Sequence, residues 1–275
     1  MRHNKKVFVL KKISLDNVKL KHQKEALREV QILRKIKHPH IIRYYHSFIE
    51  NEYLCILMEY AEGRDLHSLM KRHRHEGKLL AEKELWRIAY EIGLGVHYLH
   101  SNNIVHRDIK TAKYFGSMTN PCFSIFLTRG RTVKIGDLGV SRIIQGGCLF
   151  QGTRVGTPLY LSPEQVKQQA YDFKVDVWAV GCCLYHLACF EPPFTGDNLI
   201  ALGNNIVNKK PKSLPEQYSE RFSTFLGRML KKKAFDRPPI RDVLLFIPKS
   251  VKQSYRERYV SEQKSLERSD TADPK

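Results

Sequence analysis

The order of the periodic segments along the chain constrains its fold more than any other feature. Runs rich in β-branched and aromatic residues come first, at 7–10, 41–48 and 53–58, with one segment of helical spacing, 15–37, between them. Helical periodicity dominates the rest of the chain. This order predicts an α+β fold in which a small β-rich lobe joins a larger helical lobe near residues 59–63.

The helical part contains two segments of different character. Residues 82–101 carry apolar side chains at helical spacing, which predicts an amphipathic helix with one buried face. Residues 175–190 are apolar almost throughout, but this run includes Asp176 and His186 and is shorter than the ~20 residues that a membrane-spanning helix needs. We therefore expect a helix that is buried in the protein core.

The net charge and the cysteines limit the function only loosely. A formal charge of +19 favours acidic partners of any kind, but the basic residues are scattered, so nucleic-acid binding is the weakest alternative. None of the six cysteines forms a C-x-x-C pair, and the N-terminus lacks an apolar signal core. We expect a cytoplasmic protein, with the nucleus as the alternative, and no membrane contact.

The segment His106-Arg107-Asp108-Ile109-Lys110 is the most informative part of the sequence because it resembles the catalytic loop of protein kinases. The Asp108 carboxylate can orient an attacking hydroxyl and accept its proton. Lys110, two residues further on, can neutralise charge on a transferred phosphoryl group. A His-Arg-Asp triplet by itself is weak evidence, since it also occurs in unrelated chains.

Three further residues match the protein kinase pattern, and the resemblance implies nucleotide chemistry for them. Asp137 begins an Asp-Leu-Gly turn directly after the strand-like run 133–135, and its carboxylate offers the hard oxygen that Mg²⁺ prefers, although an ordinary turn is the alternative. Lys11 ends a strand-like run that could deliver its ammonium to phosphates. Glu29, on the expected helix, fits as its ion-pair partner, and an exposed surface pair is the alternative.

Six sequence elements occur in the order in which protein kinases carry them, and coincidence does not explain this joint order. They are Lys11, Glu29, His106-Arg107-Asp108, Asp137-Leu138-Gly139, Ser162-Pro163-Glu164 and Asp236-Arg237-Pro238. Within the kinases, segments 38–42, 62–66, 106–111 and 156–164 resemble the NIMA-related (Nek) family over about residues 7–247. The resemblance implies a two-lobed fold and transfer of the ATP γ-phosphate, with Mg²⁺, to Ser or Thr hydroxyls of protein substrates.

The resemblance also implies three regions and a place for adenine. The regions are an incomplete N-lobe, a C-lobe with the catalytic loop and activation segment, and a polar tail, at residues 1–60, 61–248 and 249–275. Met58 would be the gatekeeper, and backbone groups of Glu59 and Ala61 would bind the adenine edge. Regulatory or cytoskeletal partners follow by family analogy alone.

Structural and regulatory roles follow from the same resemblance. We expect Glu164 to pair with Arg237, which ties the activation segment to the C-lobe, and Asp176 to bind backbone amides of the catalytic loop. Arg107 is expected to pair with a phosphate on the activation segment, because charge-assisted hydrogen bonds can order such a loop. The expected acceptor is Thr153, and Thr157 belongs to the same segment; an unmodified Thr153 is the alternative.

Two departures from the kinase pattern bear on activity. Only ten residues precede Lys11 and none is Gly, so we expect the glycine-rich loop that covers the phosphates to be absent. The Asn that should follow Asp108 by five positions, as second metal ligand, is replaced by Lys113, and residues 112–124 resemble an insertion loop in which Asn120 is a weak substitute. An inactive pseudokinase that acts as a scaffold or regulator is therefore the alternative function.

Overall fold

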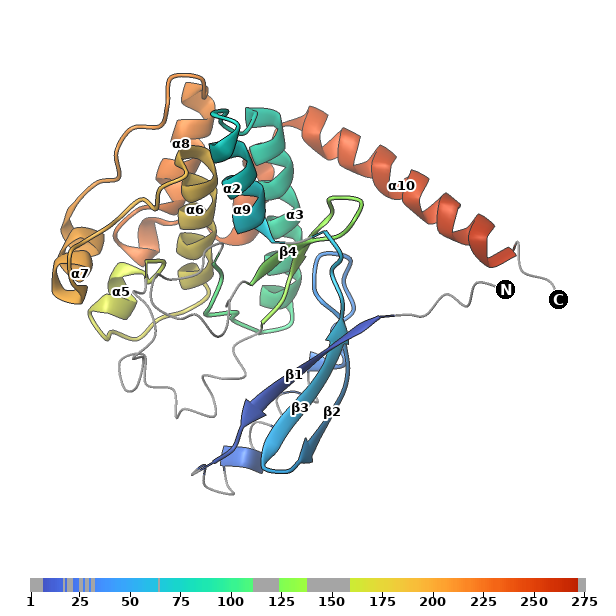
Figure 1. Ribbon diagram of the computed structural model, residues 1–275. Helices are drawn as coiled ribbons and strands as arrows, with labels where there is room; N and C mark the ends of the chain where they lie inside the picture. The colour runs from blue at the N-terminus through green and yellow to red at the C-terminus, as the bar shows by residue number, and fades with distance from the viewer. Residues whose placement is uncertain are drawn as a thin grey trace.

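The computed structural model describes residues 7–16, 18, 22–24, 27, 30, 33–63, 65–110, 124–137 and 159–271, with the backbone alone at 262–271. Figure 1 shows a narrow sheet that extends from a body of helices, with one long helix reaching outward from that body. The α+β fold with a small β-rich lobe and a larger helical lobe is confirmed.

The small lobe is built on a three-stranded antiparallel sheet with the order β1-β3-β2. Its strands are β1 (Phe8–Ser14), β2 (Tyr44–Glu50) and β3 (Tyr53–Glu59). The central strand buries Leu54, Cys55 and Ile56, as its β-branched and apolar sequence predicts. Register places Lys11 opposite Ile56, so the sheet fixes the position of this lysine.

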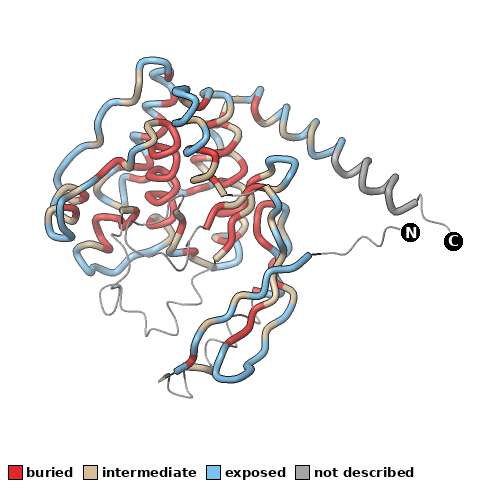
Figure 2. The backbone as a smooth tube through the Cα atoms, in the orientation of Figure 1, coloured by how far each residue is buried: buried red, intermediate tan, exposed pale blue. Residues whose placement is uncertain are grey.

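The large lobe packs around two long helices, α3 (Glu82–Ser101) and α6 (Lys174–Cys189). Figure 2 shows that α6 is buried almost throughout and that α3 is buried along part of its surface, as expected for these two segments. The other helices of this lobe are α2 (Leu66–His75), α5 (Pro163–Val166), α7 (Leu199–Asn208), α8 (Glu220–Met229), the 3-10 turn η1 (Ala234–Asp236) and α9 (Ile240–Phe246). Among the helices that the structure describes, none combines the length and the apolarity that a membrane crossing requires.

A short hairpin, β4 (Ile125–Leu127) and β5 (Val133–Ile135), lies between the lobes. The amide of Gly63 donates to the Leu127 carbonyl at 2.8 Å. A Cβ atom on Gly63 would lie 2.0 Å from the Thr128 carbonyl oxygen, so only glycine allows the chain to pass so close to the hairpin.

The first part of the long C-terminal helix α10 (Lys249–Thr271) contacts α3, and the remainder extends away from the body of helices (Figure 1). The buried His40 ring lies 2.8 Å from the Val133 carbonyl and 2.7 Å from the Tyr255 hydroxyl. Because the ring nitrogen facing a carbonyl must carry the hydrogen, neutral His40 accepts from Tyr255. Glu91, also fully buried, binds the Val133 amide and the guanidinium of Arg258.

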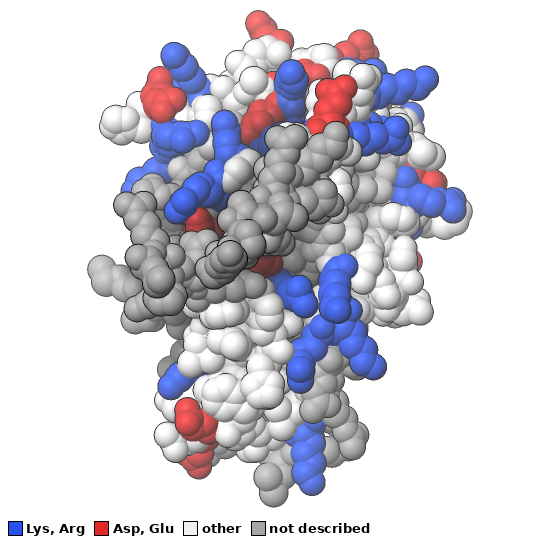
Figure 3. Space-filling view, turned by 90° about the vertical axis from the view of Figure 1, so that its right-hand side faces the viewer, with Lys and Arg blue, Asp and Glu red and all other residues white. Residues whose placement is uncertain are grey.

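Charges of both signs lie on the face that Figure 3 shows. Figure 3 shows Lys and Arg on the upper and the lower part of one face, with Asp and Glu interleaved on the upper part. The described cysteines, which are Cys55, Cys182, Cys183 and Cys189, are free thiols, and all but Cys189 are buried. They behave as small hydrophobic residues, as their apolar neighbours predict.

Candidate active site

The proposed catalytic pair lies on the loop that follows α3. The Lys110 ammonium donates to the Asp108 carboxylate at 2.9 Å, and both side chains are only 16% exposed. The sequence predicted these two residues as neighbours because they are two positions apart on a loop. The structure therefore places a carboxylate and an ammonium together in a partly water-excluded position, where electrostatic interactions are stronger than in bulk water.

Asp176, near the start of α6, holds the backbone of this loop. Its carboxylate accepts from the amides of His106 and Arg107 at 2.8 and 2.9 Å, as the kinase resemblance implies. His100 contacts the same carboxylate at 2.9 Å. Arg107 has a φ of 67°, a left-handed conformation that is costly for a residue with a side chain. The bonds to Asp176 therefore maintain a strained loop next to Asp108.

The loop and the candidate metal ligand are joined through one histidine. His106 donates from Nε2 to the Gly136 carbonyl at 2.9 Å, and its Nδ1 accepts from the Asp108 amide at 3.2 Å. Gly136 directly precedes Asp137, which also has a left-handed φ of 59°. Strand β5 thus ends in a turn whose backbone is bonded to the catalytic loop through His106.

Lys11 reaches across from the small lobe to the same place. Its ammonium forms an ion pair with the Asp137 carboxylate, although 126 positions separate the two residues. Lys11 and Asp137 are therefore brought together, and His106 links the backbone of Gly136, which precedes Asp137, to the backbone of Asp108. Glu29, the expected partner of Lys11, lies outside the described residues, so that pairing stays a prediction.

The segment expected to hold adenine connects the two lobes. Met58 and Glu59 end strand β3, and Ala61 follows two residues later. The Glu59 side chain is held by Lys134 at 2.7 Å and by the Arg43 amide at 3.0 Å. The sequence did not indicate these contacts, and the expectation that backbone groups of Glu59 and Ala61 bind the adenine edge stays a prediction.

Glu164 and Arg237 form a buried bidentate ion pair, with nitrogen–oxygen distances of 2.7 and 2.6 Å. Burial opposes ionisation of Glu164, but the hydrogen bonds and charge of Arg237 outweigh it, and the pKa of this carboxyl lies below its ordinary value. The pair fastens the start of α5 to the segment before α9. The family resemblance implied this contact, and the structure places both residues accordingly.

The regulatory residues are only partly described. Arg107 is exposed, and its guanidinium lies 6.0 Å from the centre of the Tyr171 ring. Thr153 and Thr157 lie outside the described residues, and so do Lys113 and Asn120. The proposal that a phosphorylated Thr153 binds Arg107 therefore remains a prediction.

Sequence reasoning missed one residue at this site, Ser124. It was assigned to the end of an insertion loop, but it is fully buried, it directly precedes β4, and its hydroxyl lies 2.7 Å from the Lys110 amide. The one signal was its position immediately before 125–128, the run that resembles the family sequence after the missing Asn.

The candidate site also fits Mg²⁺. Asp137 supplies a carboxylate, a hard oxygen ligand, and Mg²⁺ in proteins is commonly held by one or two carboxylates together with phosphates and water.

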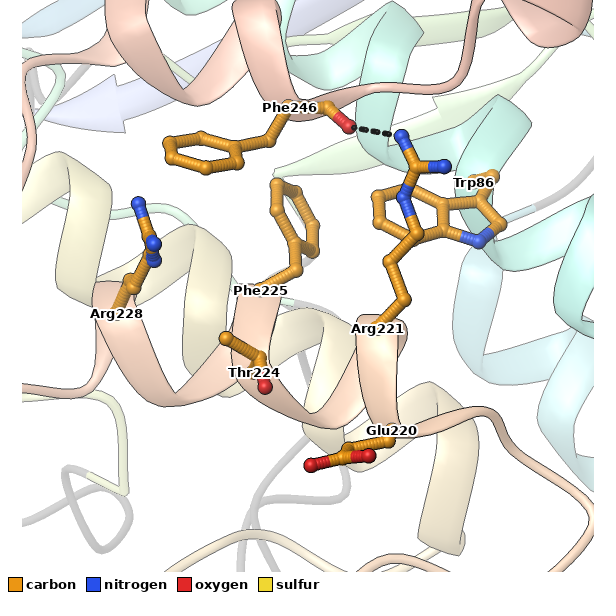
Figure 4. A pocket seen from close by; sticks show the side chains of 7 residues that line it. All are labelled: Trp86, Glu220, Arg221, Thr224, Phe225, Arg228 and Phe246. Carbon is orange, nitrogen blue, oxygen red and sulfur yellow. Dashed lines mark hydrogen bonds between the residues drawn. The ribbon is translucent and has the colours of Figure 1, made fainter.

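A hollow of about 360 Å³ lies elsewhere on the large lobe, between α3, α8 and α9 (Figure 4). Its walls are aromatic, with Trp86, Phe225 and Phe246. Arg221 donates to the Phe246 carbonyl at 3.2 Å, and the Arg228 guanidinium lies 4.1 Å from the centre of the Phe246 ring. None of the predicted catalytic or nucleotide-binding residues lines this hollow, so it is separate from the candidate site.

Comparison with known proteins agrees with the geometry. A family model described as the protein kinase domain matches residues 1–245. The serine/threonine-protein kinase Nek11 of Mus musculus is 39% identical over 86% of this chain, and Nek2 of Homo sapiens is 34% identical over 87%. The chain spans 36% of the first relative and 53% of the second. The chain therefore belongs to the protein kinase family and is similar within it to the Nek serine/threonine kinases.

Proposed function

We propose that this chain transfers the γ-phosphoryl group of ATP to Ser or Thr hydroxyls of protein substrates. The observation that carries the proposal is the ion pair of Lys11, from the small lobe, with Asp137, from the turn after β5, next to a catalytic loop whose His106 bonds the Gly136 carbonyl and the Asp108 amide. Phosphoryl transfer needs mainly positioning and electrostatic stabilisation, and these residues supply charges of both signs at one place.

Each side chain has a separate task in this mechanism. Asp108 orients the substrate hydroxyl and accepts its proton, while Lys110 at 2.9 Å offsets negative charge that develops on the transferred group. Lys11 binds phosphate oxygens from the side of the small lobe. Asp137 would hold Mg²⁺, and the bound ion would neutralise phosphate charge.

The experiment is transfer of radiolabelled γ-phosphate to casein or a Ser/Thr peptide, followed by identification of the labelled amino acid. We expect label on Ser or Thr and loss of transfer in Asp108→Asn, which keeps the size of the side chain but removes the base. A Tyr peptide is the specificity control. Equal transfer by the Asp108→Asn variant would refute the proposed role of this residue.

We further propose that the protein acts in the cytoplasm on protein substrates, because its free thiols suit a reducing compartment. Cell fractionation with an antibody to the chain tests this location. The relatives reported above are named as kinases, so they give no support to the alternative of an inactive scaffold.

A further inference from the structure

Ser124 forms several hydrogen bonds with the backbone of the catalytic loop. Its hydroxyl accepts from the Lys110 amide at 2.7 Å and lies 3.2 Å from the Lys110 carbonyl, to which it donates. Its own amide also reaches that carbonyl, at 3.3 Å. Ser124 therefore engages both backbone polar groups of Lys110, fourteen positions earlier in the chain.

The same residue contacts the turn that carries the metal ligand. The Ser124 carbonyl accepts from the Gly136 amide at 2.8 Å, and Gly136 directly precedes Asp137. One fully buried residue thus connects the backbone of the catalytic loop to the backbone of the metal-binding turn. A side chain that is itself locked by hydrogen bonds and burial can hold neighbouring groups in a fixed geometry.

We propose that Ser124 is a positioning residue, whose hydroxyl fixes the backbone of Lys110 relative to the turn that carries Asp137. We also propose that it does not act as a metal ligand. The Lys110 carbonyl takes the one hydrogen of the Ser124 hydroxyl, and one of the hydroxyl's two lone pairs accepts the Lys110 amide. The residue is fully buried, so the remaining lone pair is not exposed to an ion from solvent. The kinetic part of this proposal rests on the proposed function, and the structural part does not.

The test uses Ser124→Cys, which nearly keeps the volume but hydrogen-bonds weakly, and Ser124→Ala. Ser223→Ala, an exposed serine on α8, is the matched control. Hydrogen exchange at the Lys110 amide reports the contact without any need for activity. Steady-state kinetics then separate kcat from the KM for ATP and from the Mg²⁺ concentration at half-maximal rate.

We expect faster exchange at Lys110 and a kcat lowered by about tenfold in both Ser124 variants, because small displacements of a catalytic group reduce rates strongly. The KM for ATP and the Mg²⁺ dependence should stay near those of the unmodified chain and of Ser223→Ala. Unchanged exchange at Lys110 overturns the proposal. A shifted Mg²⁺ dependence also overturns it, whatever the exchange shows, because it would make Ser124 a ligand.

The two proposals can fail separately. If the unmodified chain transfers no phosphate, the proposed function fails, while exchange at the Lys110 amide still decides whether Ser124 holds the loop. If exchange becomes faster but kcat is unaltered, the positioning role is wrong and the proposed function stands.

Discussion

Replacement of Arg237 by alanine removes the most heavily bonded side chain among the described residues of the large lobe. The guanidinium is fully buried and donates five hydrogen bonds, two to the Glu164 carboxylate and three to backbone carbonyls. It also lies 5.0 Å from the centre of the Trp178 ring. The variant therefore leaves a buried carboxylate without its counter-charge.

The magnitude follows from that burial. Breaking a buried ion pair by removing one partner costs about 3–5 kcal/mol, because the remaining charge is left desolvated. An exposed pair costs about 0–1 kcal/mol. Arg129, whose side chain is 88% exposed beside Glu62, provides the control, so Arg129→Ala should change the free energy of unfolding by that smaller amount.

Urea denaturation followed by circular dichroism measures both variants. We expect Arg237→Ala to lower the midpoint far more than Arg129→Ala, with Arg237→Lys in between because it keeps the charge and loses the bidentate geometry. Since the pKa of Glu164 is lowered in the folded state, the pair's contribution is complete above the ordinary carboxyl pKa and is lost as pH falls below it. Equal midpoints for Arg237→Ala and Arg129→Ala would refute the reasoning.

Three further predictions concern contacts elsewhere. Asp176→Ala should lower the free energy of unfolding by about 1–3 kcal/mol for each of the two amides, of His106 and Arg107, that lose their acceptor, and it should lower kcat. Unchanged stability in urea would contradict this. Tyr255→Phe should cost about 1 kcal/mol and speed hydrogen exchange in α10, since it removes only the hydroxyl that donates to His40; identical exchange would count against it. Burial lowers the pKa of His186 to about 4, so stability should fall as pH drops from about 6.5 toward 4, and less steeply in His186→Gln; parallel pH curves would exclude this.

Elements with strong periodicity were predictable from the sequence. Helix α3 and strand β5 begin and end at the predicted residues, and the apolar run at 175–190 is the buried helix α6, shifted by one residue. These segments carry their own signal, because alternation or helical spacing of apolar side chains specifies which face is buried. The catalytic loop was recognisable because its residues are adjacent in sequence.

Contacts between distant polar groups were not predictable in the same way. His40 and Tyr255 are 215 positions apart, and no periodic pattern links a histidine before β2 to a tyrosine on the last helix. The turn-forming residues that precede Ser124 predict a loop at this position. Its role depends on the backbone position of Lys110, which only the folded chain defines.

The central claim is that Lys11 and Asp137 serve one nucleotide site, and calorimetric binding of Mg-ATP tests it most directly. Lys11→Met and Asp137→Asn are compared with Lys12→Met, which makes the same charge change at an exposed position on the opposite face of β1. We predict roughly tenfold weaker binding for Lys11→Met and Asp137→Asn, as expected for loss of one charged contact, and unaltered binding for Lys12→Met. Equal affinities for Lys11→Met and Lys12→Met would contradict the claim.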